Sequence, residues 1–215
     1  MINLARRRTV TAVALLLLAG AGQASAEWAV GADGGYFAMT NSPKSAKAIF
    51  DGSNGGATFG GFFQLGLGSS FFVAAHGRYF EKTGERVFVA NSGGEVFRLG
   101  HPLTIRLIPI YGMVGYRFGH SARWAPYVGV GGGATSYRET SNVAGLIETQ
   151  SATKAAGHLS AGVDFLTGPV RFGLEVTYSA VPNTIGESGV SKVYGETDVG
   201  GATFVARIAF GSRAP

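Results

Sequence analysis

The sequence predicts an all-β protein, an eight-stranded antiparallel up-and-down transmembrane β-barrel. Three observations favour this fold class. Successive segments alternate apolar and polar side chains with a period of two residues, as strands with two different faces do. The connections between these segments alternate between tight turns and long loops. The polar faces hold mainly Gly, Ala, Ser and Thr with scattered charges, whereas the exterior of a soluble barrel would be densely charged.

The clearest segment is the predicted β-hairpin from Leu159 to Ser179. Apolar side chains occupy every second position in both of its runs, and the runs are separated by the turn at Gly168 and Pro169. A two-residue loop fixes the register of a hairpin, and no slip is needed to align the faces. The expected cross-strand pairs are Phe165 with Phe172, Val163 with Leu174, and Leu159 with Tyr178.

The first 26 residues have the features of a cleaved signal peptide. Three arginines precede an apolar run from Val10 to Ala19, and residues 24 to 26 have the small-x-small pattern that signal peptidase accepts. We therefore expect export with cleavage after Ala26, a leader at 1–26 and one β-barrel domain at 27–215. An uncleaved anchor is disfavoured, because the apolar run is shorter than the roughly 20 residues of a spanning helix.

The composition of the remaining chain argues against several classes of protein. Removing the three leader arginines from the 18 basic residues leaves 15 basic against 13 acidic residues, a net charge of +2. So small a positive charge does not indicate a nucleic-acid-binding protein. There is no cysteine, so no disulfide stabilises the exported chain. The run from Leu107 to Tyr116 is too short for a spanning helix and contains Pro109. The four histidines are dispersed, so we expect neither a metal site nor a cofactor.

Eight strands are expected after the leader, each with alternating faces. In order they cover Trp28 to Thr40, Ala57 to Leu67, Phe71 to Phe80, Leu103 to Phe118, Pro126 to Arg138, the two runs of the hairpin from Leu159 to Ser179, and Gly200 to Phe210. Pro109 in the fourth strand requires a bulge or an irregular site. Gly129, Gly131 and Gly133 share one face of the fifth strand, where the opposite wall or another side chain must come close.

The connections fall into two classes. Short turns are expected near residues 69, 121 and 168. The long connections are Asn41 to Gly56, Arg86 to Leu99, Glu139 to Ser151 and Ala180 to Val199. The second of these reads as a small hairpin around Asn91 to Gly94, which would carry strands three and four past the barrel as a projecting flap. All turns therefore lie at one end, and a membrane barrel of this kind places its long loops outside the cell.

An even, antiparallel set of strands can close into a barrel without an unpaired edge. Closure is required in lipid, because every backbone N–H and C=O must be bonded within the protein. Aromatic residues near the strand ends suit the two interfacial girdles of such a barrel. They are Trp28, Phe71, Tyr79, Phe118, Trp124, Tyr178 and Phe210. A monomer is expected.

Charged residues on the inward faces form the candidate site. The lumen of an eight-stranded barrel is only wide enough to be filled by side chains, so charges inside it should pair. Arg117, Asp164, Arg171 and Arg207 sit near the turn end, and Asp33, His76, Arg78 and Glu175 sit nearer the middle. Acids and bases at similar depths predict a lumen charge network. The network acts either as a plug or as a gate, and the plug is the preferred interpretation.

At the level of architecture the chain resembles the small eight-stranded outer-membrane barrels of the OmpA and OmpW type. The resemblance rests on the leader, the asymmetry of turns and loops, PYVGVGGGATSYRE at 126–139 and the closing strand ATFVARIAF at 202–210. It implies the bacterial outer membrane as location, with outer-membrane lipid, lipopolysaccharide and the barrel-assembly machinery as partners. Family members usually end on the aromatic residue of the last strand, whereas Gly211 to Pro215 follow Phe210 here.

Several functions are compatible with this architecture. A structural or surface-interaction role in the envelope is preferred. The resemblance to the OmpW type and the glycine face of the fifth strand favour, as the alternative, a narrow channel for small or apolar solutes. A soluble secreted barrel of the lipocalin kind, with its apolar face around a ligand, fits the polar faces poorly.

Catalysis is not expected. His158 and Ser160 share a strand face, as in a small family of outer-membrane lipid deacylases, but Ala161 rather than Asn follows the serine. Alternation points both side chains inward, away from lipid, and Glu175 should lie in a different layer from the pair, whereas a serine nucleophile needs a base and an orienting acid. In the last loop a divalent cation has three possible ligands, although solvated loop carboxylates are the commoner case. These are Glu187, Glu196 and Asp198.

Overall fold

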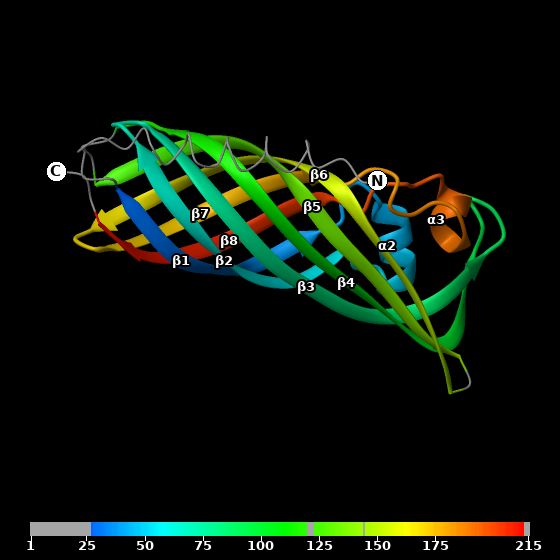
Figure 1. The fold of residues 1–215 in the computed structure, drawn as a ribbon. Helices are drawn as coiled ribbons and strands as arrows, with labels where there is room; N and C mark the ends of the chain where they lie inside the picture. Colours follow the sequence, from blue (N-terminus) through cyan, green and yellow to red (C-terminus); the bar gives the residue numbers. More distant parts are fainter. Residues whose placement is uncertain (1–26, 120–122, 144, 213–215) are drawn as a thin grey trace, which may run out of the picture.

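The structure is a computed structural model that describes residues 27–119, 123–143 and 145–212. Its strands form one closed barrel, in which neighbours in sequence pair antiparallel and β1 pairs with β8 (Figure 1). The strands are β1 Trp28–Ala38, β2 Gly55–Leu67, β3 Phe71–Val89, β4 Val96–Arg117, β5 Trp124–Val143, β6 Leu146–Thr167, β7 Val170–Ala180 and β8 Gly201–Gly211. The predicted fold class is thus confirmed. The predicted signal peptide, 1–26, lies outside the described residues.

The β6–β7 hairpin has the predicted register. The pairs are Phe165 with Phe172, Val163 with Leu174, and Leu159 with Tyr178. Thr167 pairs with Val170, so Gly168 and Pro169 form the two-residue loop. Gly168 has a φ of 60°, which glycine adopts without the steric cost that a Cβ would bring. Turn chemistry and face pattern therefore specify the same register.

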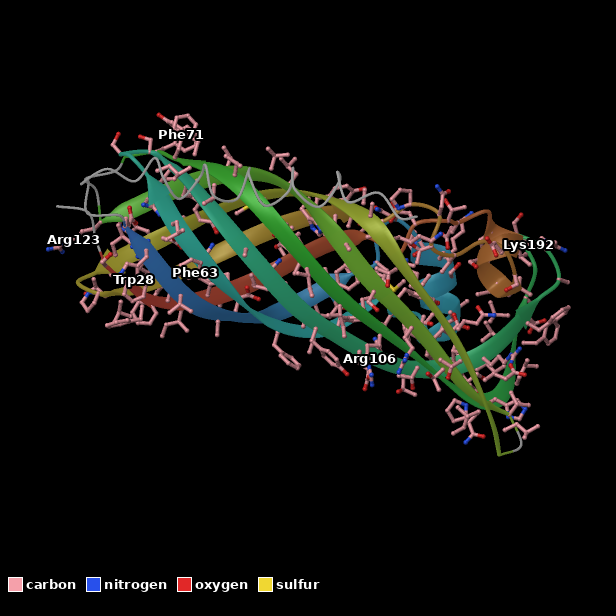
Figure 2. The ribbon with its side chains drawn as sticks, in the orientation of Figure 1. Trp28, Phe63, Phe71, Arg106, Arg123 and Lys192 are labelled. Atoms are coloured by element: carbon pink, nitrogen blue, oxygen red, sulfur yellow. The ribbon has the colours of Figure 1, made fainter. Side chains whose placement is uncertain are left out.

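Apolar side chains cover the outside of the barrel, and buried charges lie inside it. Phe59, Val130 and Leu174 are 62%, 64% and 63% exposed. Figure 2 shows aromatic side chains projecting from the outer surface near the turn end, among them Phe71. A lipocalin-type barrel has the opposite arrangement, so the alternative with an apolar lumen is wrong. Among the described residues, no helix is long and apolar enough to cross a membrane.

Six of the seven predicted aromatic girdle residues lie near strand ends, whereas Tyr79 lies in the middle of β3, because this strand continues to Val89. Those at the turn end with exposed side chains are Trp28, Phe71, Phe118, Trp124 and Phe210. Tyr79 and Tyr178 lie toward the other end, and the Tyr178 hydroxyl donates to Asn41 Oδ1 at 2.6 Å. An apolar band between two aromatic rings is the surface that a membrane barrel presents to lipid.

Strands β3 to β6 are much longer than the other strands. They contain 19, 22, 20 and 22 residues, whereas β1, β2, β7 and β8 contain 11 to 13. A transmembrane strand needs about 9–11 residues, so only the long strands continue well beyond the bilayer. Figure 1 shows this continuation at the loop end. We call it the wall, residues 81–89, 96–106, 138–143 and 146–156.

The flap predicted at Arg86 to Leu99 is the outer part of this wall. Cross-strand pairs extend the β3–β4 ladder to Val89 and Val96. The register shifts between Glu85 and Val87, which marks a β-bulge below the flap. Pro109 lies lower in β4, where the ladder lacks pairs between the partners Gly77–Ile110 and Phe80–Leu107. The predicted irregular site is therefore present.

The predicted loop from Glu139 to Ser151 is wrong, because both of its arms are strands. β5 pairs with β6 without interruption from Trp124–Phe165 to Val143–Leu146. Sequence reasoning missed this extension because wall strands are exposed on their outer side and carry polar residues at most positions, so the apolar period disappears.

Two other predicted loops contain short helices. α2, Pro43–Ile49, lies within the predicted loop from Asn41 to Gly56, and α3, Gly189–Tyr194, lies within the one from Ala180 to Val199. α2 starts with proline in its first turn, a favourable position. A helix this short is stabilised by packing rather than by propensity. It packs into a buried cluster at the loop end that includes Phe37, Met39, Ile49, Phe80, Leu107, Tyr137 and Val199.

The glycine face of β5 shares its inward direction with Tyr127 and is approached closely by β4. A Cβ at Gly129 would lie 2.9 Å from Met113 Cγ, and one at Gly133 would lie 2.7 Å from Tyr111 Cβ. At Gly131 the nearest atoms belong to the backbone of Gly112. The predicted close approach at these glycines is confirmed, and Met113 fills the space at Gly129.

Candidate functional site

Arg78 lies at the centre of the lumen network. Its Nε is 3.0 Å from Asp33 and its Nη2 is 2.5 Å from Glu175. Its Nη1 also donates to Thr177 Oγ1 at 3.3 Å. The two carboxylate side chains are 1% and 0% exposed. Because β3 and β7 lie opposite each other in the ring, this arginine connects two sides of the barrel.

Arg207 of β8 completes the middle layer. Its Nη1 donates to Glu175 Oε2 at 2.8 Å and to the Tyr127 hydroxyl, and its Nε is 3.6 Å from Asp164. Its guanidinium carbon lies 3.9 Å from the centre of the Phe62 ring, within cation–π range. Tyr127 also donates to Glu175 Oε2, at 2.6 Å. Both carboxylate oxygens of Glu175 are therefore hydrogen-bonded.

A second layer lies nearer the turn end. Glu27 Oε1 is 2.7 Å from Arg117 Nη1 and 2.7 Å from Arg171 Nη1. Arg171 also donates to the carbonyl oxygen of Ser212 at 2.8 Å. The Arg117 guanidinium carbon lies 5.7 Å from the centre of the Phe72 ring. One carboxylate thus bridges two arginines on β4 and β7.

The buried charges of the lumen balance. In the described part of the chain, the buried carboxylates are Glu27, Asp33, Asp164 and Glu175, and the buried arginines are Arg78, Arg117, Arg171 and Arg207. Four negative and four positive charges leave no net charge. Ion pairs offset their desolvation cost only with good geometry and further hydrogen bonds. The middle layer provides these around Glu175, whereas in the turn-end layer Nε and Nη2 of Arg117 have no hydrogen-bond partner among the described residues.

A row of stacked rings lies beside the middle layer. Phe62, His76, Tyr111 and His158 have successive ring centroids 5.6, 4.8 and 3.9 Å apart. Within the described residues, no hydrogen-bond partner reaches the ring nitrogens of either histidine or the Tyr111 hydroxyl. The cavity beside Arg78, Tyr111 and His158 measures about 30 Å³, enough for about one water molecule. No solute-sized space adjoins the network there.

All eight predicted site residues are buried in the lumen, but they do not form one network. The middle layer contains Asp33, Arg78, Asp164, Glu175 and Arg207, and the turn-end layer contains Arg117 and Arg171. His76 belongs to the ring stack instead. The predicted turn-end positions of Arg207 and Asp164 are wrong, because strand stagger brings Arg207 level with Asp33, its partner in the β1–β8 ladder, and Asp164 lies 3.6 Å from Arg207.

Sequence reasoning missed Glu27 and Tyr127 as members of the network. Alternation places both on inward faces, which was a usable signal. Another signal is glycine opposite an inward arginine, because Gly60 pairs with Arg78 and Gly173 pairs with Arg207. A Cβ at Gly60 would lie 2.6 Å from the Arg78 Cγ, so the glycine makes room for the arginine to cross the lumen.

His158 and Ser160 do not form a nucleophile and base. The Ser160 hydroxyl is 3.0 Å from Thr177 Oγ1. The His158 ring stacks on Tyr111, and its nitrogens have no hydrogen-bond partner among the described residues. Both residues are buried, in agreement with their predicted inward direction. The geometry offers no activated serine.

Two of the three carboxylates considered as ligands for a cation accept hydrogen bonds from backbone N–H groups instead. Glu196 accepts the backbone N–H groups of Lys44 and Ser45 at 3.0 and 2.8 Å. Asp198 accepts those of Val181 and Gly200 at 2.9 and 2.6 Å. Glu187, the third, is exposed. Within residues 27–119, 123–143 and 145–212, no group of three or more His, Asp or Glu side chains could hold a metal ion.

Comparison with protein families gives one match. The family model described as outer membrane protein beta-barrel domain matches residues 11–207. A comparison with curated proteins gives no match.

Solved structures resemble this one at low sequence identity. A major outer membrane protein from Thermus thermophilus is 11% identical, with a TM-score of 0.55, over 87% of this chain and 100% of that one. Ail, the attachment invasion locus protein of Yersinia pestis, is 12% identical, with a TM-score of 0.48, over 87% and 97%. Neisserial surface protein A is 12% identical, with a TM-score of 0.47, over 86% and 95%. Of these three, the Thermus protein shows the shared fold.

Proposed function

Because this chain belongs to the outer membrane protein beta-barrel domain family, as a small eight-stranded barrel of the OmpA and OmpW type, we propose that it acts at the bacterial surface without conducting solutes. The observation that carries this proposal is the contrast between its two parts. The lumen holds charge-balanced layers, whereas the wall extends beyond the barrel and packs against the buried loop-end cluster only through part of its inner face, including Leu103 and Ile105 (Figure 1). The function is therefore a surface interaction made by the wall.

The free edge of β6 is the part of the wall suited to a partner. From Leu146 to Ala156, β6 pairs with β5 on one side and, in the described part of the chain, with no strand on the other. An exposed strand edge offers unpaired N–H and C=O groups to an extended segment of another protein. Leu146 and Ile147 at the tip are 73% and 72% exposed, which adds apolar contact area. The partner is an extended protein segment.

The narrow-channel alternative has less support. A path would have to pass Arg78, Glu175 and Arg207, which are bonded to one another and buried. On the glycine face of β5, the Met113 side chain already fills the space at Gly129. Catalysis has less support still, because Ser160 lacks a base. A surface interaction is therefore the function with the most support.

Photo-crosslinking in living cells tests this role. A photoreactive residue replaces Gln150, which is exposed on the free part of β6. The expected result is a discrete protein adduct. The matched control replaces Leu174, which is also exposed but faces lipid, and should give no adduct. Thr149→Pro should abolish the Gln150 adduct, because N–H groups alternate sides along a strand and that of Thr149 points to the free edge, whereas even-numbered residues such as Leu166 donate to β5. The same products from Gln150 and Leu174 would contradict the proposal.

A further inference from the structure

Three rows of outward residues cross β4, β5 and β6 where the apolar surface of the barrel ends. The lowest row is Ile110, Ala134 and Ala155, the next is Ile108, Ser136 and Thr153, and the highest is Arg106, Arg138 and Ser151. Successive rows are two residues apart along each strand, or roughly 7 Å. The outer surface therefore changes from apolar to basic within the depth of a lipid headgroup region.

Arg106 and Arg138 are direct cross-strand partners. Like charges placed opposite each other destabilise a sheet, so the pair needs a counter-charge. Arg106 has one, because its Nε donates to Glu81 Oε2 at 2.6 Å. In the described part of the chain, no acid pairs with Arg138, which is exposed. Glu81 thus neutralises Arg106 alone, and the positive charge of Arg138 remains.

The surroundings hold Arg106 in place. The Tyr79 hydroxyl donates to the same Glu81 oxygen at 2.7 Å, and the guanidinium carbon of Arg106 lies 5.6 Å from the centre of the Tyr79 ring. These hydrogen bonds from Tyr79 and Arg106 keep the pKa of the Glu81 carboxyl below its usual range. Arg106 donates to Glu81 through Nε, which leaves its two Nη groups clear of that carboxylate. Figure 2 shows its side chain projecting from the outer surface.

A groove runs over these rows on the outside of the sheet. Its volume is about 490 Å³, and it is lined by Arg106, Ile108, Ser136, Arg138, Ser151, Ala152 and Thr153. Guanidinium groups bind phosphate with charge-assisted, often bidentate hydrogen bonds, and hydroxyl groups supply further donors. Ile108 and the row below it continue the groove into the apolar surface. The lining is complementary to an anionic headgroup joined to an acyl chain.

We propose that Arg106 and Arg138 bind a phosphate group of a lipid in the outer leaflet, of the lipopolysaccharide class. Ser136, Ser151 and Thr153 donate further hydrogen bonds, and the acyl chains lie along Ile108 and Ile110. The apolar row beneath the arginines favours a lipid over free phosphate. The inference uses the orientation of the proposed function, with long loops outside, but not the partner of the β6 edge.

Binding of purified barrel in zwitterionic detergent to immobilised lipid A tests this site. The double variant Arg106→Gln, Arg138→Gln should bind about tenfold or more weakly, because it loses the charge-assisted hydrogen bonds to the phosphate. Arg123→Gln is the matched control, since Arg123 is exposed at the turn end (Figure 2) and its loss should leave binding unchanged. Wild-type protein should also bind dephosphorylated lipid A about tenfold or more weakly.

Four outcomes would overturn the assignment. They are equal binding of phosphorylated and dephosphorylated lipid, equal loss in the Arg123 control, full competition by inorganic phosphate, and equally tight binding of an acidic peptide. The comparison between lipids uses unaltered protein, so it holds whatever the variants do to folding. Crosslinking from Gln150 uses a different strand edge, so failure of one proposal leaves the other measurable.

Discussion

Arg78 and Glu175 meet at 2.5 Å in the lumen, although 97 residues separate them and their strands lie on opposite sides of the ring. Glu175 also accepts hydrogen bonds from Arg207, Tyr127 and Thr177. One buried carboxylate therefore joins both arginines of the middle layer. We expect the stability of the closed barrel to depend on this carboxylate.

Glu175→Ala should destabilise the barrel strongly. The substitution leaves Arg78 with Asp33 alone and removes the 2.8 Å partner of Arg207. Removing one member of a buried ion pair costs about 3–5 kcal/mol, because the other charge stays buried. Urea unfolding in detergent, followed by the heat-dependent shift in gel mobility, measures this loss.

Glu148→Gln is the matched control for this prediction. Glu148 lies 2.7 Å from Arg86, but its side chain is 62% exposed. An exposed pair contributes about 1 kcal/mol or less, so the unfolding midpoint should barely move. Equal effects of the two substitutions would show that burial of the lumen network contributes nothing to stability.

Leu174→Arg should impair insertion or cost about 2–4 kcal/mol, because Leu174 is on the apolar outer face near the middle of its strand. Thr149→Arg, on an exposed position of the wall, should be tolerated. Thr177→Arg would instead add a positive charge beside Arg78 inside the lumen. Folding yield into lipid vesicles distinguishes the first two variants, and similar yields would mean that the outer face is assigned incorrectly.

Single cysteines at Ser92 and Ser188 should react with an impermeant thiol reagent on whole cells, whereas one at Ser69 should not. Ser92 and Ser188 lie in exposed connections at the loop end, and Ser69 lies in the short β2–β3 turn. The chain has no cysteine of its own, so the background is low. Labelling at Ser69 alone would invert the proposed orientation.

The barrel itself was predictable because its signals are local. Alternation in β6 and β7 and the turn at Gly168 specify a register that needs no tertiary information, and the structure has that register. Inward and outward faces follow from the same period of two. Eight antiparallel strands joined by alternating turns and loops have no unpaired edge in the membrane only if they close into a barrel.

The remaining features depend on tertiary structure. The wall extension of β5 and β6 has no continuous apolar face, so its sequence predicts a loop although the two segments pair as strands. α2 forms because the barrel mouth buries Ala46 and Ile49. The depth of Arg207 depends on strand stagger, which one strand does not encode. The contacts of Glu27 with Arg117 and Arg171 depend on closure of the barrel, so the local sequence alone does not predict them.

Single-channel recording in planar bilayers tests the central claim that the lumen is closed. Wild-type protein, Glu175→Ala and Asp164→Ala are reconstituted after each has passed the heat-modifiability check. If the network is a plug built into a filled bore, all three proteins give flat traces, because the rings and arginines still occupy the lumen. Discrete conductance steps from wild-type protein, or steps that appear when Glu175 or Asp164 is removed from an intact barrel, would contradict the plug and establish a gated channel.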